Sequence, residues 1–289
     1  MAYTLAEFKQ SDNSKRPHYF VIGHPIGHSL SPLMHQIALN HYQIDATYIA
    51  LNLHPAELSS FAAWCNRDEF LGCNITIPFK NEMLHLVDEI DPSAINIGAI
   101  NTIAKKNGKL TGYNTDVYGF LKPLDTYLDT LELNRAVIFG TGGSSKAVKK
   151  GLEEIGFTEL VFVTTKPAGK IITSEFSTIF VSDYSQWTAF ALDASLIVNT
   201  TPLGMPPHTG QSPVEWKDAT YLRDKICYDL VYNPPETEFL KQSMKNNAVG
   251  INGLDMLIFQ GSRSFKIWTG KSFPVKKIRK KLKDHIYSL

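Results

Sequence analysis

The strongest constraint on the fold is a strand, a glycine-rich turn and a helix that follow one another in the second half of the chain. Residues 135–139 form an apolar run, Gly-Thr-Gly-Gly-Ser-Ser follows at once, and residues 146–155 have helical character. Such glycines let the backbone approach a pyrophosphate, whose charge the N-terminus of the helix receives. The pattern predicts a Rossmann-like, doubly wound fold that binds a dinucleotide through Gly140, Thr141, Gly142, Gly143 and Ser144.

The segment after the next expected strand, 160–163, indicates which dinucleotide is bound. An NAD site commonly carries Asp or Glu at this point for the ribose hydroxyls. The chain has Thr164, Thr165 and Lys166 instead. Two hydroxyls and a cation are more compatible with a 2′-phosphate, so the sequence favours NADP, although a solvated turn remains an alternative for Lys166.

Composition narrows the class of protein. A chain of 289 residues, 43% hydrophobic and 20% charged, is long enough for two domains. The net charge of +1 provides no global attraction to nucleic acid or membrane. Three cysteines without metal-like spacing predict neither a disulfide framework nor a metal site. No apolar run is long enough to span a membrane, and residues 1–15 lack the apolar core of a signal peptide, so we expect a cytoplasmic protein.

Strands alternate with helices along the rest of the chain, which predicts an α/β fold. The expected strands are 19–22, 47–51, 73–77, 195–199 and 225–231, with a hairpin around 105–108. The expected helices are 55–64, 80–90, 117–128, 254–268 and 275–286, the last of these a solvated amphipathic helix.

Two charged residues are candidates for acid–base chemistry. Pro78 ends a predicted strand and would open a helix that has Lys80 in its first turn. A cation near the partly positive N-terminus of a helix should lose its proton more readily. Asp116 begins a later predicted helix, where it is either a capping carboxylate or a partner for Lys80 in proton transfer. An ordinary surface lysine remains the alternative for Lys80.

Two serines are candidates for binding an anion. Ser31 and Pro32 are typical of a helix start, with the hydroxyl as N-cap and proline at the first helical position. Ser29 and Ser31 would then stand beside free backbone N–H groups, which suits a carboxylate or a phosphate. The alternative, that Ser31 only caps the helix and Ser29 is loop, stays open.

Taken together, these motifs resemble the shikimate dehydrogenase family over nearly the whole chain from about Tyr19. The resemblance implies an N-terminal α/β substrate-binding catalytic domain, residues 1–115 and 250–289, and a Rossmann-like NADP-binding domain, residues 116–249, with a cleft between them. The segments that carry it are 23–35, 74–80, 97–102, 112–116, the glycine turn, 199–205, and 252–256 with Gln260 and Gly261.

The resemblance also implies the reaction and the roles of individual residues. The reaction is the reversible, NADPH-dependent reduction of 3-dehydroshikimate to shikimate in aromatic amino acid (chorismate) biosynthesis, by a monomer or homodimer. Lys80 and Asp116 would be catalytic. The implied substrate-binding residues are Ser29, Ser31, Thr76, Asn101, Tyr228 and Gln260. Further implied cofactor contacts are Thr200, Gly253 and Met256.

Two positions depart from the family pattern. Members that use NADP usually carry Asn-Arg-Thr where this chain has Thr164–Lys166, and Asp255 replaces a commoner glycine. The alternatives are a quinate/shikimate dehydrogenase that uses NAD or NADP, an aminoshikimate-type relative, and a non-catalytic nucleotide-binding sensor on the same fold.

Overall fold

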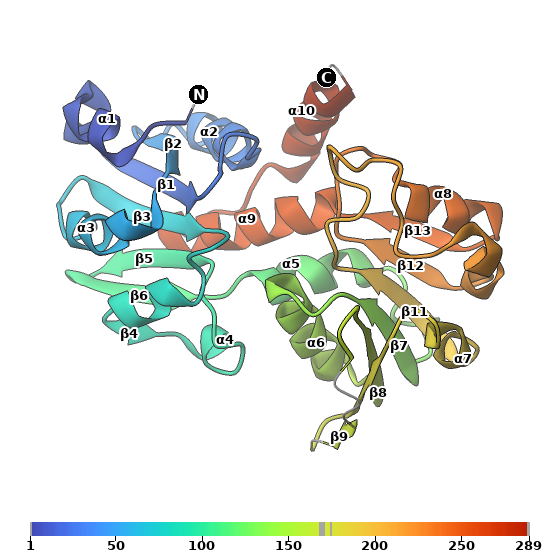
Figure 1. The fold of residues 1–289 in the computed structure, drawn as a ribbon. Helices are drawn as coiled ribbons and strands as arrows, with labels where there is room; N and C mark the ends of the chain where they lie inside the picture. The colour runs from blue at the N-terminus through green and yellow to red at the C-terminus, as the bar shows by residue number, and fades with distance from the viewer. Residues whose placement is uncertain (1, 168–170, 174, 288–289) are drawn as a thin grey trace. The chain divides into compact units, whose positions relative to one another are not determined.

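The computed structural model describes residues 2–167, 171–173 and 175–287. The chain divides into two compact units (Figure 1). The first comprises Met1–Asp116 and Ile258–His285, and the second comprises Val117–Leu257 and the last four residues. The boundaries expected from the sequence fell after residues 115 and 249, whereas the units divide after Asp116 and Leu257.

The first unit contains a six-stranded sheet in the order β2-β1-β3-β5-β6-β4. Strands β1, β2 and β3 are parallel, while β5 is antiparallel to both β3 and β6. Asn107 and Gly108 have positive φ between β5 and β6, which confirms the expected hairpin. The strands are β1 (His18–Gly23), β2 (Thr47–Asn52), β3 (Phe70–Ile75), β4 (Glu89–Ile90), β5 (Thr102–Lys106) and β6 (Lys109–Tyr113).

Helices cover both faces of this sheet. One core cluster packs Phe8 and Phe61, from α1 (Leu5–Gln10) and α3 (Leu58–Trp64), against Phe20 and Phe70 of the strands. On the other face lie α2 (Ser31–His41) and α9 (Leu254–Thr269), since His35 of α2 stacks on Tyr48 and contacts the ring of Trp268. The remaining short elements are the 3-10 helices η1 (Asp12–Lys15), η2 (Pro55–Glu57) and η3 (Glu82–Leu86) and the helix α4 (Pro92–Ile95).

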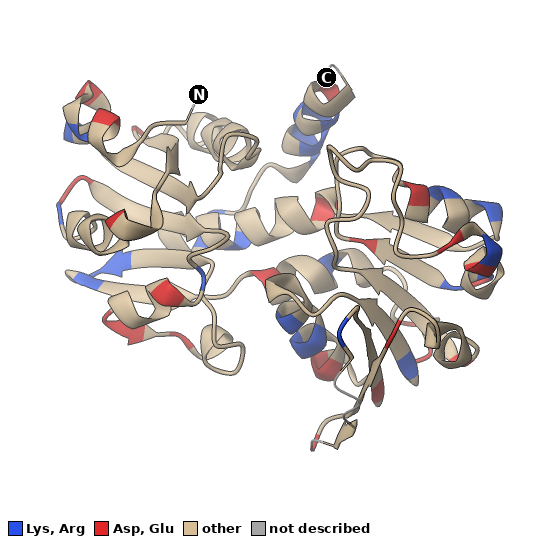
Figure 2. Cartoon of the chain, viewed as in Figure 1, with Lys and Arg blue, Asp and Glu red and all other residues tan. Residues whose placement is uncertain are grey.

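The C-terminal helix α10 (Val275–Tyr287) confirms the predicted amphipathic pattern. Ile278, Leu282 and Ile286 are buried on one stripe. Lys and Arg occupy much of the remaining surface of α10 (Figure 2). Among the described residues, no helix is both long and apolar enough to cross a membrane.

The second unit contains a seven-stranded sheet in the order β13-β12-β11-β7-β8-β10-β9, parallel except for β9. One face packs on α5 (Asp116–Leu121) and α6 (Gly143–Ile155), and the other on α7 (Trp187–Ala191) and α8 (Glu238–Lys245). This is the predicted doubly wound arrangement. The strands are β7 (Arg135–Phe139), β8 (Glu159–Val163), β9 (Ile171–Thr173), β10 (Thr178–Ser182), β11 (Ala194–Asn199), β12 (Ile226–Asp229) and β13 (Val249–Asn252), and the 3-10 helices are η4 (Lys122–Leu124) and η5 (Trp216–Leu222).

Two helix predictions are wrong. No α-helix follows Pro78: β3 ends at Ile75, a turn carries Lys80, and the next helical element is the 3-10 helix η3. The Lys80 carbonyl accepts a hydrogen bond from Ile100 N, which comes from outside the segment. The helix expected over 117–128 ends at Leu121, because Pro123 disfavours helical backbone at the residue before it.

Candidate active site

Lys80 and Asp116 form an ion pair in the first unit. The Lys80 Nζ donates to Asp116 Oδ2 at 2.5 Å, and the two side chains are only 21% and 12% exposed. Lys80 lies in the turn after β3, while Asp116 is the first residue of α5, which follows β6. The pairing expected from the sequence is therefore present. The predicted field of a helix N-terminus at Lys80 is wrong, because Lys80 lies in a turn and no α-helix begins there.

Asn101 orients the Asp116 carboxylate. Its Nδ2 donates to Asp116 Oδ1 at 2.7 Å and to Thr115 Oγ1 at 2.9 Å. Its Oδ1 accepts from the Thr115 backbone N–H at 2.8 Å. Asn101 is 3% exposed, so water competes little for these bonds. One oxygen of the carboxylate thus faces an amide and the other an ammonium group.

The serine pair lies at the start of α2, but Ser31 is not its cap. Leu30 occupies the N-cap position, and its side chain makes no capping hydrogen bond. Ser31 is therefore the first helical residue and Pro32 the second, because the helix begins one residue earlier than expected. Ser29 Oγ accepts from Ser31 N at 3.3 Å, which brings the two serines together.

Thr76 and Gln260 belong to the same unit as the ion pair. Thr76 follows β3 directly, and its backbone N–H donates to Ile22 O at 2.9 Å. Gln260 is half-buried on α9, and its carbonyl accepts from Ser264 Oγ at 3.1 Å. Hydrogen bonds join Lys80, Asp116 and Asn101 directly. Gln260 is connected to Asn101 through Ser264 and Thr102.

Tyr228 lies in the second unit, on β12. It is fully buried and stacks on Phe120, with ring centroids 5.2 Å apart at 14°. Within the described part of the chain, its hydroxyl has no hydrogen-bond partner. Burial, with a smaller contribution from Asp255, raises the pKa of Tyr228 well above its usual value. A buried hydroxyl without a partner is costly, so a polar ligand atom would stabilise it.

The glycine turn has the geometry that a pyrophosphate requires. Gly140 has φ +100°, and a Cβ there would lie 2.7 Å from Thr200 Oγ1. Gly142 is the N-cap of α6, which begins at Gly143 and so earlier than residue 146, and no described side chain caps it. A Cβ on Gly142 or Gly143 would meet no described atom within 4 Å. The N-terminus of α6 therefore faces open space, and these residues fit a dinucleotide phosphate.

The other predicted cofactor residues follow strand ends or join α9. Thr164, Thr165 and Lys166 come directly after β8, and the last two are exposed. Thr200 follows β11 and donates to Phe139 O at 2.7 Å. Gly253 joins β13 to α9, where a Cβ would lie 2.1 Å from Leu230 O. Met256 differs from these, because it is 9% exposed and packs in a core cluster.

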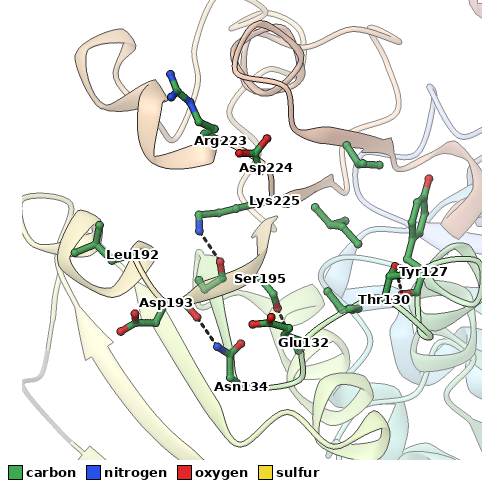
Figure 3. Close-up of a pocket in the computed structure, with 14 residues that line it drawn as sticks. Tyr127, Thr130, Glu132, Asn134, Leu192, Asp193, Ser195, Arg223, Asp224 and Lys225 are labelled. Carbon is green, nitrogen blue, oxygen red and sulfur yellow. Dashed lines mark hydrogen bonds between the residues drawn. The ribbon is translucent and has the colours of Figure 1, made fainter.

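A pocket of about 570 Å³ lies in the second unit at the amino ends of β7, β11, β12 and β13 (Figure 3). The glycine turn follows the carboxyl end of β7, so the pocket is at the opposite edge of the sheet. Lys225 Nζ donates to Ala194 O at 2.6 Å across it. Its lining combines Arg223 and Lys225 with acidic side chains, so the charges do not favour one class of ligand. None of the residues predicted for catalysis or binding is among those that line it.

The sequence analysis did not predict a group of buried polar residues that is hydrogen-bonded to Asn101, the partner of Asp116. Ser264 on α9 lies within hydrogen-bonding distance of Asn74, Thr102 and Thr115. The only available signal was polar residues inside otherwise apolar elements, such as Asn74 in β3. Their mutual proximity depends on segments up to 190 residues apart.

Comparison with known proteins identifies the family. Residues 21–103 match the shikimate dehydrogenase substrate binding domain, and residues 253–283 match the shikimate 5'-dehydrogenase C-terminal domain. A shikimate dehydrogenase (NADP(+)) of Methanococcus maripaludis is 37% identical over 270 residues, which cover 92% of this chain and 96% of the relative.

Solved structures agree with this match. A shikimate 5-dehydrogenase from Listeria monocytogenes, in complex with shikimate and NAD, superposes with a TM-score of 0.83 at 27% identity and covers 93% of this chain and 96% of its own. The enzyme from Thermus thermophilus, in complex with NADP(H) and shikimate, gives 0.77 at 30% identity, with 91% and 97% covered. With the fold and the Lys80–Asp116 pair, these matches show that the chain belongs to the shikimate dehydrogenase family.

Proposed function

We propose that Lys80 and Asp116 are the proton-transfer pair with which this NADP-dependent shikimate dehydrogenase interconverts 3-dehydroshikimate and shikimate in chorismate biosynthesis. The observation that carries the proposal is their 2.5 Å contact at a largely shielded position. In a shielded pair each charge stabilises the other, which keeps a proton donor and its counter-ion together at one position.

The chemistry requires a hydride and a proton. NADPH, when bound, supplies the hydride to the ring carbonyl carbon. The carbonyl oxygen then takes a proton from the Lys80–Asp116 pair, and the Lys80 charge stabilises the negative charge that develops on that oxygen.

The residues proposed to bind the substrate belong mostly to the first unit. The hydroxyls of Ser29 and Ser31 at the start of α2 bind the carboxylate. Thr76, Asn101 and Gln260 orient the ring hydroxyls. Tyr228 is the substrate-side residue of the second unit, and its unpaired buried hydroxyl supports this role. We assign residues 1–115 and 250–289 to the substrate-binding domain and 116–249 to the NADP-binding domain.

Binding of NADP is proposed for the turn Gly140–Ser144 and for three strand ends. The uncapped N-terminus of α6 receives the pyrophosphate. Thr164, Thr165 and Lys166 contact the 2′-phosphate, because they are accessible at the end of β8 and include no carboxylate. Thr200, Gly253 and Met256 are the proposed contacts of the nicotinamide, and Met256, which packs in a core cluster, would contribute only the small part of its side chain that is exposed.

The test is an absorbance assay of shikimate oxidation with NADP and NAD side by side, repeated with quinate. We expect a higher kcat/KM for shikimate with NADP than for any other pairing. Efficient quinate oxidation with NAD would favour the quinate/shikimate alternative. Binding of NADP without turnover would favour the non-catalytic sensor.

We also propose that the protein works in the cytoplasm as a monomer or homodimer. The three cysteines are free and buried, which is compatible with a reducing compartment. Light scattering after size-exclusion chromatography measures the oligomeric state.

A further inference from the structure

Ser264 presents one buried hydroxyl to three segments of the first unit. It lies on α9, one turn after Gln260, and is fully buried. Its Oγ is 2.9 Å from Asn74 Nδ2, 2.7 Å from Thr102 Oγ1 and 3.2 Å from Thr115 Oγ1. It also lies 3.1 Å from Gln260 O. The hydroxyl thus connects β3, β5 and the residue before Asp116 to the helix that carries Gln260.

The direction of the hydrogen bonds is set at both ends of this network. Tyr48 OH donates to Asn74 Oδ1 at 2.7 Å, so the Asn74 amide nitrogen faces Ser264 and Asn101 O. The Thr115 backbone N–H donates to Asn101 Oδ1, which is therefore an acceptor. The Asn101 amide nitrogen must then face Asp116. The reverse orientation would place an amide oxygen against a carboxylate, which is repulsive.

Between these two ends, each hydroxyl has a single proton to donate. Thr102 Oγ1 donates to Asn101 Oδ1 at 3.0 Å. Thr102 Oγ1 also lies 2.7 Å from Ser264 Oγ, where either hydroxyl can be the donor, because Ser264 Oγ has Gln260 O as a second acceptor at 3.1 Å. Ser264 in turn accepts from Asn74. The network therefore runs without a break from Tyr48 and Asn74 through Ser264 and Thr102 to the amide of Asn101.

We propose that Ser264 is a positioning residue for catalysis. Its hydroxyl holds Thr102 in position, and Thr102 in turn supports the Asn101 amide, which holds Asp116 Oδ1 and leaves Oδ2 for Lys80. Buried polar networks of this kind act as a unit and lose specificity when one member is left unsatisfied. The inference rests on the proposed roles of Asn101, Lys80 and Asp116.

The first test compares Ser264→Ala with Ser262→Ala. Ser262 is a matched control, because it is buried on the same helix and its Oγ accepts only a backbone bond from Phe273 N, at 3.0 Å, among the contacts described. Loss of one buried hydrogen bond corresponds to roughly a three- to tenfold lower kcat for Ser264→Ala, with the KM for NADP unchanged. Ser262→Ala should lower Tm but leave kcat at the wild-type value.

Wild-type kcat in Ser264→Ala, with only a lower Tm, would overturn the proposal. If Ser264→Ala does not yield folded protein, Ser264→Cys is measured instead, since it keeps nearly the same volume and a weak donor. Its kcat should then fall below that of the wild type while its Tm stays close. An unchanged kcat in Ser264→Cys would again count against the positioning role.

A double-mutant cycle tests whether Ser264 acts through Asn101. In the Asn101→Ala background, Ser264→Ala should lower kcat by less than about twofold, because the group that it supports through Thr102 is gone. Multiplicative losses would show that Ser264 acts elsewhere. Lys80→Ala is measured in parallel: if it retains turnover, the proposed function itself fails, whereas an inactive Lys80→Ala with a normal Ser264→Ala rejects only this inference.

Discussion

Lys80 and Asp116 are 36 residues apart in sequence, and neither segment alone identifies its charged residue as functional. The Lys80 segment is compatible with a surface lysine, and the Asp116 segment with a helix cap. Their contact shows that Lys80 is not an ordinary surface lysine, because its side chain is only 21% exposed and its ammonium group is bonded to a carboxylate. The functional role proposed for each residue therefore depends on its contact with the other.

Lys80→Ala should lower kcat by about 100-fold or more, because it removes both a proton carrier and a charge that stabilises the reacting oxygen. Binding of shikimate should change much less, since the carboxylate and most hydroxyl contacts remain. Steady-state kinetics and a direct binding titration separate the two effects.

Lys109→Ala is the matched control for this substitution. Lys109 also forms an ion pair in the first unit, with Glu89 at 2.8 Å, but both side chains are more than half exposed. We expect wild-type kinetics from this variant. A Lys80→Ala enzyme that keeps near-normal turnover would remove Lys80 from the chemistry.

His35 makes the first unit sensitive to acid. It is fully buried, stacks on Tyr48 at 4.1 Å, and has no hydrogen-bond partner for either ring nitrogen among the described residues. Burial lowers the pKa of His35 to about 3 from its usual 6.5. Between these values the unfolded chain binds a proton that the folded chain does not, so His35 makes stability fall as the pH drops from 6.5 towards 3.

His35→Leu should therefore reduce the slope of stability against pH in this window, by at most about 1.4 kcal/mol per pH unit for a single proton. Denaturant unfolding at several pH values between 4 and 7 measures the slope. His41→Leu, which changes an exposed histidine on the same helix, is measured as the control. An equal slope in His35→Leu and the wild type would contradict the assignment.

At the scale of elements, α9 is fixed to the sheet of the first unit by Trp268. Its indole stacks on Tyr19 at 4.7 Å and donates from Nε1 to Ile103 O at 2.9 Å. The ring lies directly over Gly72 of β3, where a Cβ would be 2.4 Å from Nε1. Glycine at this position therefore allows α9 to pack closely, and α9 carries both Gln260 and Ser264.

Gly72→Ala should destabilise the protein by roughly 1–3 kcal/mol, because the indole or the strand must move to admit the methyl group. The displacement of α9 should also raise the KM for shikimate more than the KM for NADP. Thermal unfolding and steady-state kinetics measure these effects. Gly210→Ala is the control, since a Cβ there meets no described atom within 4 Å. A Gly72→Ala variant with normal Tm would show that the contact is relaxed without cost.

Elements whose signal is local could be predicted from the sequence, and those decided by distant contacts could not. The apolar run before Gly140 and the glycine turn sufficed for β7, the start of α6 within a few residues, and the doubly wound sheet. The helix predicted after Pro78 is a turn in the structure, because contacts of Phe79 and Met83 with a core built by distant strands decide the backbone there. Ser264 could not be predicted as part of the site for the same reason, because its partners Thr102 and Asn74 are 162 and 190 residues away in the sequence.

At the scale of the whole molecule, each compact unit has its own sheet and its own buried clusters. The proposed contacts with substrate and with NADP are divided between the two units in the same way. Most substrate residues belong to the first unit, and the glycine turn and the residues after β8 and β11 belong to the second. The binding of the two ligands should therefore respond to different substitutions.

Gly142→Val provides the test of this separation. The valine side chain would project into the open space before α6, so the fold should be preserved while the pyrophosphate is blocked. In the wild type, NADP at about 100 times its Kd should stabilise the protein by about 2.7 kcal/mol, seen as a higher Tm, and shikimate should act independently. In Gly142→Val we expect the NADP shift to disappear and the shikimate shift to remain. Loss of both shifts with an unchanged ligand-free Tm would mean that the two sites are coupled, and a retained NADP shift would mean that the glycine turn does not hold the cofactor.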